Sequence, residues 1–189
     1  MNHQIIDKET NDIQYGSKNI PRFSEPEHAG VCSAGPLLIG ALIVCYNTRE
    51  SLGTSSDVAG GEAKIPIPNW QIDEAQEKQV QAWAESKGVW IPNSDKLLTA
   101  SFGSMIAQGA EAKVFYKEGS GAVVKARTSI YATLGRAIEA IALHNYLFPE
   151  TSMKVFGFTR DTDGLFRILL SQPYIDVSVW QRKQKLMLW

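Results

Sequence analysis

A glycine-bearing turn between two short apolar strands, followed by a third strand that carries one lysine, constrains this chain more than any other feature. Residues 106–116 predict strand, tight turn and strand, and residues 122–126 predict the strand that holds Lys125. Such a turn can cover the phosphates of a nucleoside triphosphate with its backbone, while the ammonium group meets the α and β oxygens. An ordinary glycine-containing hairpin explains the same pattern. Features elsewhere in the chain are therefore needed to distinguish a nucleotide-binding turn from such a hairpin.

Composition excludes several classes of function. The chain has 189 residues and a net charge of −1, which gives no basic surface for nucleic acid. Cys32 and Cys45 do not form a disulfide framework, and the three histidines show no ligand spacing with them, so we expect reduced, packed thiols and no metal site. The first 22 residues are polar and lack a signal peptide, which predicts a cytoplasmic protein.

The N-terminal third is expected to contribute little regular structure. Residues 1–28 are polar and interrupted by glycine and proline, and residues 51–61 are typical of a flexible linker. Residues 29–48 carry no charge, but their dense apolar run is too short for a membrane span and predicts a buried strand or short helix. We therefore place a domain boundary near residues 50–69 and treat 1–69 as a segment of unknown role.

A helix is predicted over residues 73–87. Asp73 can cap its N-terminus, Gln76 completes a capping box, and Gly88 suits the position after its end. Val80, Trp83 and Ala84 share one face, and residues 89–91 then run extended to a proline. Trp83 and Trp90 are interpreted as packing anchors.

A second helix is predicted over residues 129–148, where Pro149 ends it. Its apolar stripe consists of Leu134, Ile138, Ile141 and Ala142. Glu139 lies beside that stripe, so its carboxylate faces a partly buried space and requires a cation. Lys125, which lies 14 residues upstream on the preceding strand, is the candidate partner.

Two further strands complete the order. Residues 153–160 and 165–175 predict strands joined by the turn Asp161-Thr162-Asp163-Gly164. From residue 97 the order is three strands, one helix and two strands. The sequence therefore predicts an α+β fold with five antiparallel strands and one helix after the third.

This order resembles the N-terminal lobe of a protein kinase. In the kinase pattern G-x-G-x-x-G-x-V the valine aligns with Val114, and the glycine positions hold Ala107, Gly109 and Ala112. Residues 108–112 also resemble the nucleotide loop of the small atypical kinase of the KEOPS complex. Over residues 75–178 the chain is similar to the serine/threonine/tyrosine kinase domain found in polyvalent proteins of bacterial mobile elements, of the Bacteroides type.

The resemblance implies a kinase-like N-lobe over residues 70–178 that binds ATP with Mg²⁺. The glycine turn would cover the phosphates, Lys125 would pair with them, and Glu139 would orient Lys125 through an ion pair. Residues 171–174 would form the hinge against the adenine edge. The implied nucleotide-binding residues are Gly109, Ala110, Val114, Val123, Lys125, Glu139, Gln172 and Tyr174.

The motifs that carry catalysis in the family are not found. Thr159-Arg160-Asp161 imitates the catalytic loop, but Phe166 occupies the place of its asparagine, and Asp163-Gly164 is interpreted as part of the turn. We therefore assign no catalytic and no metal-binding residue, and expect a truncated lobe that is inactive alone. Residues 179–189 form a tail that is either the scar of a truncated reading frame or a short basic, amphipathic helix.

Two alternatives stay open. The chain could be a non-catalytic interaction module, whose open lobe exposes Phe156 and Phe158 to a protein partner or to self-association. It could also be a small structural α+β domain in which Lys125 and Glu139 form only a structural ion pair. The substrate and the role of residues 1–69 cannot be predicted from the sequence.

Overall fold

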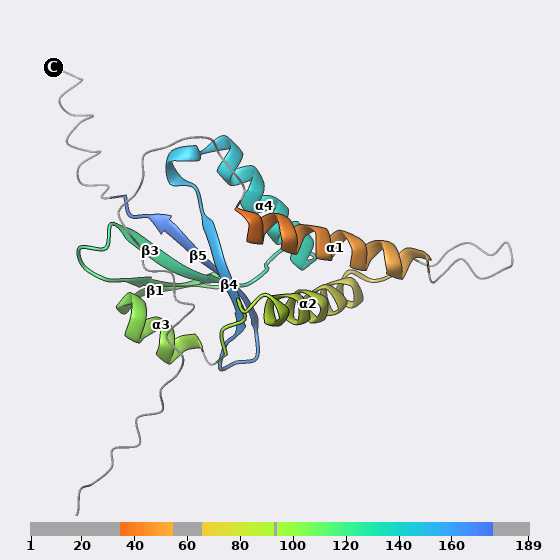
Figure 1. Cartoon of the computed structure of the whole chain (residues 1–189), viewed down its shortest axis with the longest axis horizontal. Coiled ribbons are helices and arrows are strands. Elements are labelled where there is room, and N and C mark those ends of the chain that lie inside the picture. The colour runs from red at the N-terminus through yellow and green to blue at the C-terminus, as the bar shows by residue number, and fades with distance from the viewer. Residues whose placement is uncertain (1–34, 55–65, 93, 176–189) are drawn as a thin grey trace, which may run out of the picture.

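The computed structural model describes residues 35–54, 66–92 and 94–175, which form four α-helices and a five-stranded antiparallel sheet (Figure 1). The helices are α1 (Pro36–Thr54), α2 (Asn69–Ser86), α3 (Ser94–Phe102) and α4 (Leu134–Leu147), and a 3₁₀ turn follows at Pro149–Thr151. The strands are β1 (Ser104–Gln108), β2 (Ala112–Tyr116), β3 (Ala122–Arg127), β4 (Lys154–Arg160) and β5 (Phe166–Pro173). The predicted α+β class, with one helix after the third strand, is confirmed. The predictions for residues 1–28, the tail 179–189 and Cys32 lie outside the described residues.

The strand order is β1-β2-β3-β5-β4, which puts β3 at the centre of the sheet. In the register of the antiparallel pairs, Lys125 on β3 lies between Val114 on β2 and Leu170 on β5. Because neighbouring residues across a sheet point to the same side, these three side chains share one face.

Both faces of the sheet are covered, and alternation along the strands decides which residues meet which helices. Phe115, Val124 and Leu169 point toward Leu98 of α3 and form a small core. The opposite face, with Ile168 and other residues of β5, packs against α1, α2 and α4 and forms the larger core. A strand buried on both faces needs apolar residues at successive positions, and the central part of β5 has them.

Helix α4 is shorter than predicted at its start. It begins at Leu134 rather than Ser129, and Thr133 caps it by accepting a hydrogen bond from the Arg136 amide at 3.4 Å. It ends at Leu147, before Pro149, as predicted. The predicted apolar stripe of α4 packs into the larger core.

The predicted N-cap at Asp73 is wrong, because α2 begins four residues earlier. Asp73 instead accepts a hydrogen bond from the Leu134 amide at 2.6 Å, and Gln76 accepts one from the Gly135 amide at 2.9 Å. The first amides of a helix have no partner within it and need outside acceptors when they are buried. The two polar side chains that were predicted to cap their own helix therefore cap α4.

Helix α1 belongs to the same packed unit as the sheet. Leu38, Ala41 and Cys45 are buried in the larger core, against α2 and α4. Burial, with the charges of Asp73 and Glu139, raises the pKa of the Cys45 thiol to about 12, as expected for a packed, reduced cysteine. The helix runs to Thr54, so it is longer than predicted and takes in the start of the predicted linker. None of the helices in the described ranges is long and apolar enough to cross a membrane.

The prediction that an open lobe would expose Phe156 and Phe158 is wrong. Phe156 packs under α3, with its ring centroid 5.5 Å from that of Phe102. Phe158 is fully buried on the other side of the sheet, edge-on to Trp83 at 6.0 Å. Trp90 pairs with Phe158 through the backbone, next to the edge strand β4. Both tryptophans contribute to packing, as predicted.

Candidate functional site

The predicted nucleotide-binding residues of the sheet lie on a single face, the one that also carries α4. Val114, Val123, Lys125 and Gln172 come from β2, β3 and β5, and each is wholly or partly buried. The register places Val114 opposite Lys125 and Val123 opposite Gln172. Residues that are 58 positions apart in sequence thus form one continuous surface.

The glycine turn closes over one end of this surface. The Gly109 amide donates to the carbonyl of Ala112 at 2.9 Å, which closes the turn between β1 and β2. The carbonyl of Glu111 accepts a hydrogen bond from the Thr128 amide at 2.8 Å, which ties the turn to the end of β3. Ala110 lies within the turn. The backbone of the turn is therefore anchored beside the strand that carries Lys125.

The fold itself does not require glycine at position 109. Gly109 lies outside the left-handed region, and a Cβ built on it would meet no atom within 4 Å. Gly103 differs, because its φ is 87° and a Cβ there would lie 2.3 Å from the Tyr116 carbonyl oxygen. Neither close packing nor a left-handed backbone therefore explains why glycine occupies position 109.

At the other end of the surface two tyrosines stack. The ring centroids of Tyr116 and Tyr174 are 4.6 Å apart with an interplanar angle of 28°. The Tyr174 amide donates to the Gly121 carbonyl at 2.9 Å, and the Gln172 side chain donates to the Thr151 carbonyl at 2.8 Å. These bonds hold the segment that follows β5 next to Val123.

Lys125 is a partly buried cation that has no anion beside it in the part of the chain that the structure describes. Among the described residues it makes no ion pair and no hydrogen bond through its side chain. Burial lowers the pKa of Lys125 below its ordinary value, and the nearby charge of Arg127 lowers it further. A cation in this state gains from any negative group that reaches it.

The predicted ion pair between Lys125 and Glu139 is not formed. Glu139 accepts a hydrogen bond from the Tyr46 hydroxyl at 2.6 Å and pairs with Arg136 at 2.8 Å. The hydrogen bond from Tyr46, and then the bond and charge of Arg136, hold the pKa of Glu139 below its ordinary value. Arg136, three residues before Glu139 on α4, was recognisable from helical spacing. Tyr46 lies 93 residues away on α1 and left no local signal.

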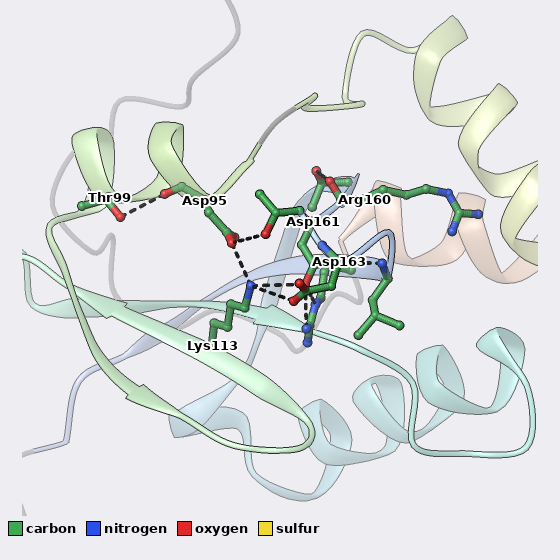
Figure 2. A network of polar contacts seen from close by, with 10 residues as sticks. Asp95, Thr99, Lys113, Arg160, Asp161 and Asp163 are labelled. Carbon is green, nitrogen blue, oxygen red and sulfur yellow. Dashed lines mark hydrogen bonds and ion pairs between the residues drawn. The ribbon is translucent and has the colours of Figure 1, made fainter.

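Sequence reasoning also missed a charged cluster on the opposite face of the sheet (Figure 2). The ammonium group of Lys113 on β2 lies 2.8 Å from Asp95 of α3, 3.3 Å from Asp161 and 4.0 Å from Asp163. Burial disfavours the Lys113 cation, but the bonds and charges of Asp95 and Asp161 outweigh it and raise its pKa. The cluster joins α3, β2 and the turn between β4 and β5.

Asp161 acts as a turn residue, as predicted. Its carboxylate is fully buried, and one oxygen accepts hydrogen bonds from the amides of Asp163 and Leu165, each at 3.0 Å. The other oxygen lies 2.9 Å and 2.7 Å from two nitrogens of Arg167. Because protein groups already occupy both oxygens, this aspartate is not available to a metal ion or a substrate.

The family comparison agrees with this arrangement of elements. The model of the family described as Serine/Threonine/Tyrosine Kinase found in polyvalent proteins matches residues 73–187, from α2 to beyond the last described strand. Comparisons with curated proteins and with solved structures find no match. More than half of the chain is matched, with five strands and α4 in the order of a kinase N-lobe. The chain therefore belongs to the family of serine/threonine/tyrosine kinases found in polyvalent proteins.

Proposed function

We propose that residues 70–178 form a lobe that binds ATP under the glycine turn. The observation that carries this proposal is Lys125, a partly buried cation without an ion-pair partner among the described residues. It lies on the sheet face next to the anchored turn, where phosphate oxygens would restore its missing counter-charge. Backbone amides of the turn would cover the same phosphates, since they approach a ligand without a side chain between.

The remaining residues fit an adenine site beside the phosphates. Val114 and Val123 supply apolar surface near Lys125. The segment Gln172–Tyr174 extends past Ser171, the last residue of β5 that pairs with β4, and its backbone would form the hinge. Glu139 would orient Lys125 when it turns from its present partners. The residues of the proposed site are Gly109, Ala110, Val114, Val123, Lys125, Glu139, Gln172 and Tyr174.

Magnesium would arrive with the nucleotide. Among the described residues no group of three or more histidines, cysteines and carboxylates is placed to hold a metal ion. These residues do not form a binding site for Mg²⁺ by themselves. We further propose that this lobe alone transfers no phosphoryl group, because the one motif that imitates a catalytic loop uses Asp161 for its turn.

Replacing the turn glycine tests the function directly. The full chain is titrated with ATP·Mg²⁺ by isothermal calorimetry, as wild type and as Gly109→Val. We expect the wild type to bind and the variant to bind about tenfold more weakly, because a side chain would hold the phosphates away from the turn amides. The unfolding free energy should change by less than about 0.5 kcal/mol, since a Cβ at position 109 meets only open space.

Gly103→Ala is the control for this experiment. Its Cβ would collide with the backbone of Tyr116, so this variant should lose stability rather than ligand affinity. A wild-type chain that binds no ATP would overturn the proposed function. If Gly109→Val binds ATP with wild-type affinity, the glycine turn does not contact the phosphates.

A further inference from the structure

Arg127 lies on the same face of β3 as Lys125, two residues further along the strand. In the register of the sheet Arg127 is opposite Ala112, the first residue after the glycine turn. Its side chain is 14% exposed, so the guanidinium is largely removed from water beneath the turn. The lobe therefore presents two cations in a row, Lys125 in the middle of the face and Arg127 under the turn.

The partner of Arg127 is weakly held. Its nearest carboxylate oxygen belongs to Glu111 at 3.4 Å, beyond the usual 2.7–2.9 Å of a charge-assisted bond. Glu111 sits in the turn itself and its side chain is 45% exposed, so water competes for it. The guanidinium also lies 5.8 Å from the centre of the Tyr131 ring, a cation–π contact that does not depend on Glu111. Arg127 can therefore exchange this carboxylate for a better anion without rebuilding the turn.

The charges next to the turn are not balanced. Lys125 and Arg127 contribute two positive charges, whereas Glu111 pairs with Arg127 and no described carboxylate pairs with Lys125. The two cations repel each other: burial lowers the pKa of Lys125, and the charge of Arg127 lowers it further. A ligand with several negative charges would relieve this repulsion, whereas a singly charged ligand would engage one cation.

We propose that Arg127 is a second phosphate-binding residue, which contacts the terminal phosphate of a nucleoside triphosphate and takes Glu111 as its partner only in the absence of the ligand. This inference rests on the proposed function and names its substrate class. A guanidinium suits the task, because its fork of N–H donors matches the oxygens of a phosphate group. The lobe should accordingly prefer triphosphates to monophosphates.

The test compares the affinities of the full chain for ATP and for AMP, both with Mg²⁺, in the wild type and two variants. In Arg127→Gln we expect ATP to bind about tenfold more weakly and AMP to bind as before. In Glu111→Gln we expect ATP to bind severalfold more tightly, because the competing carboxylate is gone. An ion pair with a purely structural role predicts the opposite sign for Glu111→Gln. Arg127→Lys, which keeps the charge, serves if Arg127→Gln does not fold, and should lose part of the ATP affinity.

Two results separate this inference from the proposed function. If the wild type binds ATP and Arg127→Gln shows wild-type affinities for both nucleotides, Arg127 does not contact the phosphates and the proposed function stands. A Glu111→Gln variant that binds ATP more weakly would equally overturn the inference. If the wild type binds neither nucleotide, both proposals fail together.

Discussion

Replacing Lys125 with methionine is expected to weaken ATP binding about ten- to a hundredfold without lowering the stability of the fold. The affinity falls because a hydrogen bond to a charged group contributes about 1.5–3 kcal/mol, and each 1.4 kcal/mol is about tenfold. The stability holds because the ammonium group is partly buried with no ion-pair partner among the described residues, and its pKa is already lowered. Below that pKa the charged lysine destabilises the folded state. An apolar side chain of similar length removes this destabilisation.

Calorimetric titration with ATP·Mg²⁺ and urea denaturation measure the two effects on the same samples. Lys117→Met is the matched control, since it removes the same charge from an exposed position in the turn after β2. The control should keep both affinity and stability. A Lys125→Met variant that binds ATP like the wild type would show that the lysine is structural. A large loss of stability would show that it has a partner in the folded chain.

Replacing Asp161 with asparagine is expected to lower the unfolding free energy by about 3–5 kcal/mol, which is the cost of leaving a buried ion pair without one partner. The carboxylate is fully buried, and it neutralises Arg167 and Lys113, whose side chains are 6% and 7% exposed. Asparagine keeps an oxygen for the two turn amides but loses the charge. Asp163→Asn is the matched control. It lies 4.0 Å from Lys113, is 68% exposed, and should cost less than about 1 kcal/mol.

The same network predicts a pH dependence. Burial alone would raise the pKa of Asp161, but the bonds and charge of Arg167, an amide bond and Lys113 hold it below the ordinary 3.8. An aspartate with a folded pKa below its unfolded value stabilises the fold above the unfolded value, and this contribution is lost as the pH falls through the folded pKa. Urea midpoints should therefore fall below about pH 4 in the wild type and change less in Asp161→Asn. Equal acid dependence in both proteins would mean that Asp161 does not carry the effect.

Local sequence signals predicted the elements well, because each depends on residues a few positions apart. The strands β2 and β3, the turn at Asp161–Gly164 and the end of α4 before Pro149 all follow from the backbone preferences of neighbouring residues. Helix α3 was missed, since the order of strands was counted from residue 97 and the stretch 97–116 was interpreted as the hairpin. The apolar side chain of Leu98 is buried only through its tertiary contact with the cluster that contains Phe115, which the local sequence does not reveal.

The sequence by itself determined the order of strands and helix, the glycine turn and the strand position of Lys125, since these follow from local periodicity. Only the tertiary structure decided the partners of the polar side chains. Asp73 and Gln76 cap α4 instead of α2, and Glu139 bonds to Tyr46 instead of Lys125. A hydrogen bond depends on which groups meet within about 3 Å in space, and spacing along a chain carries no record of contacts made 60 to 90 residues away.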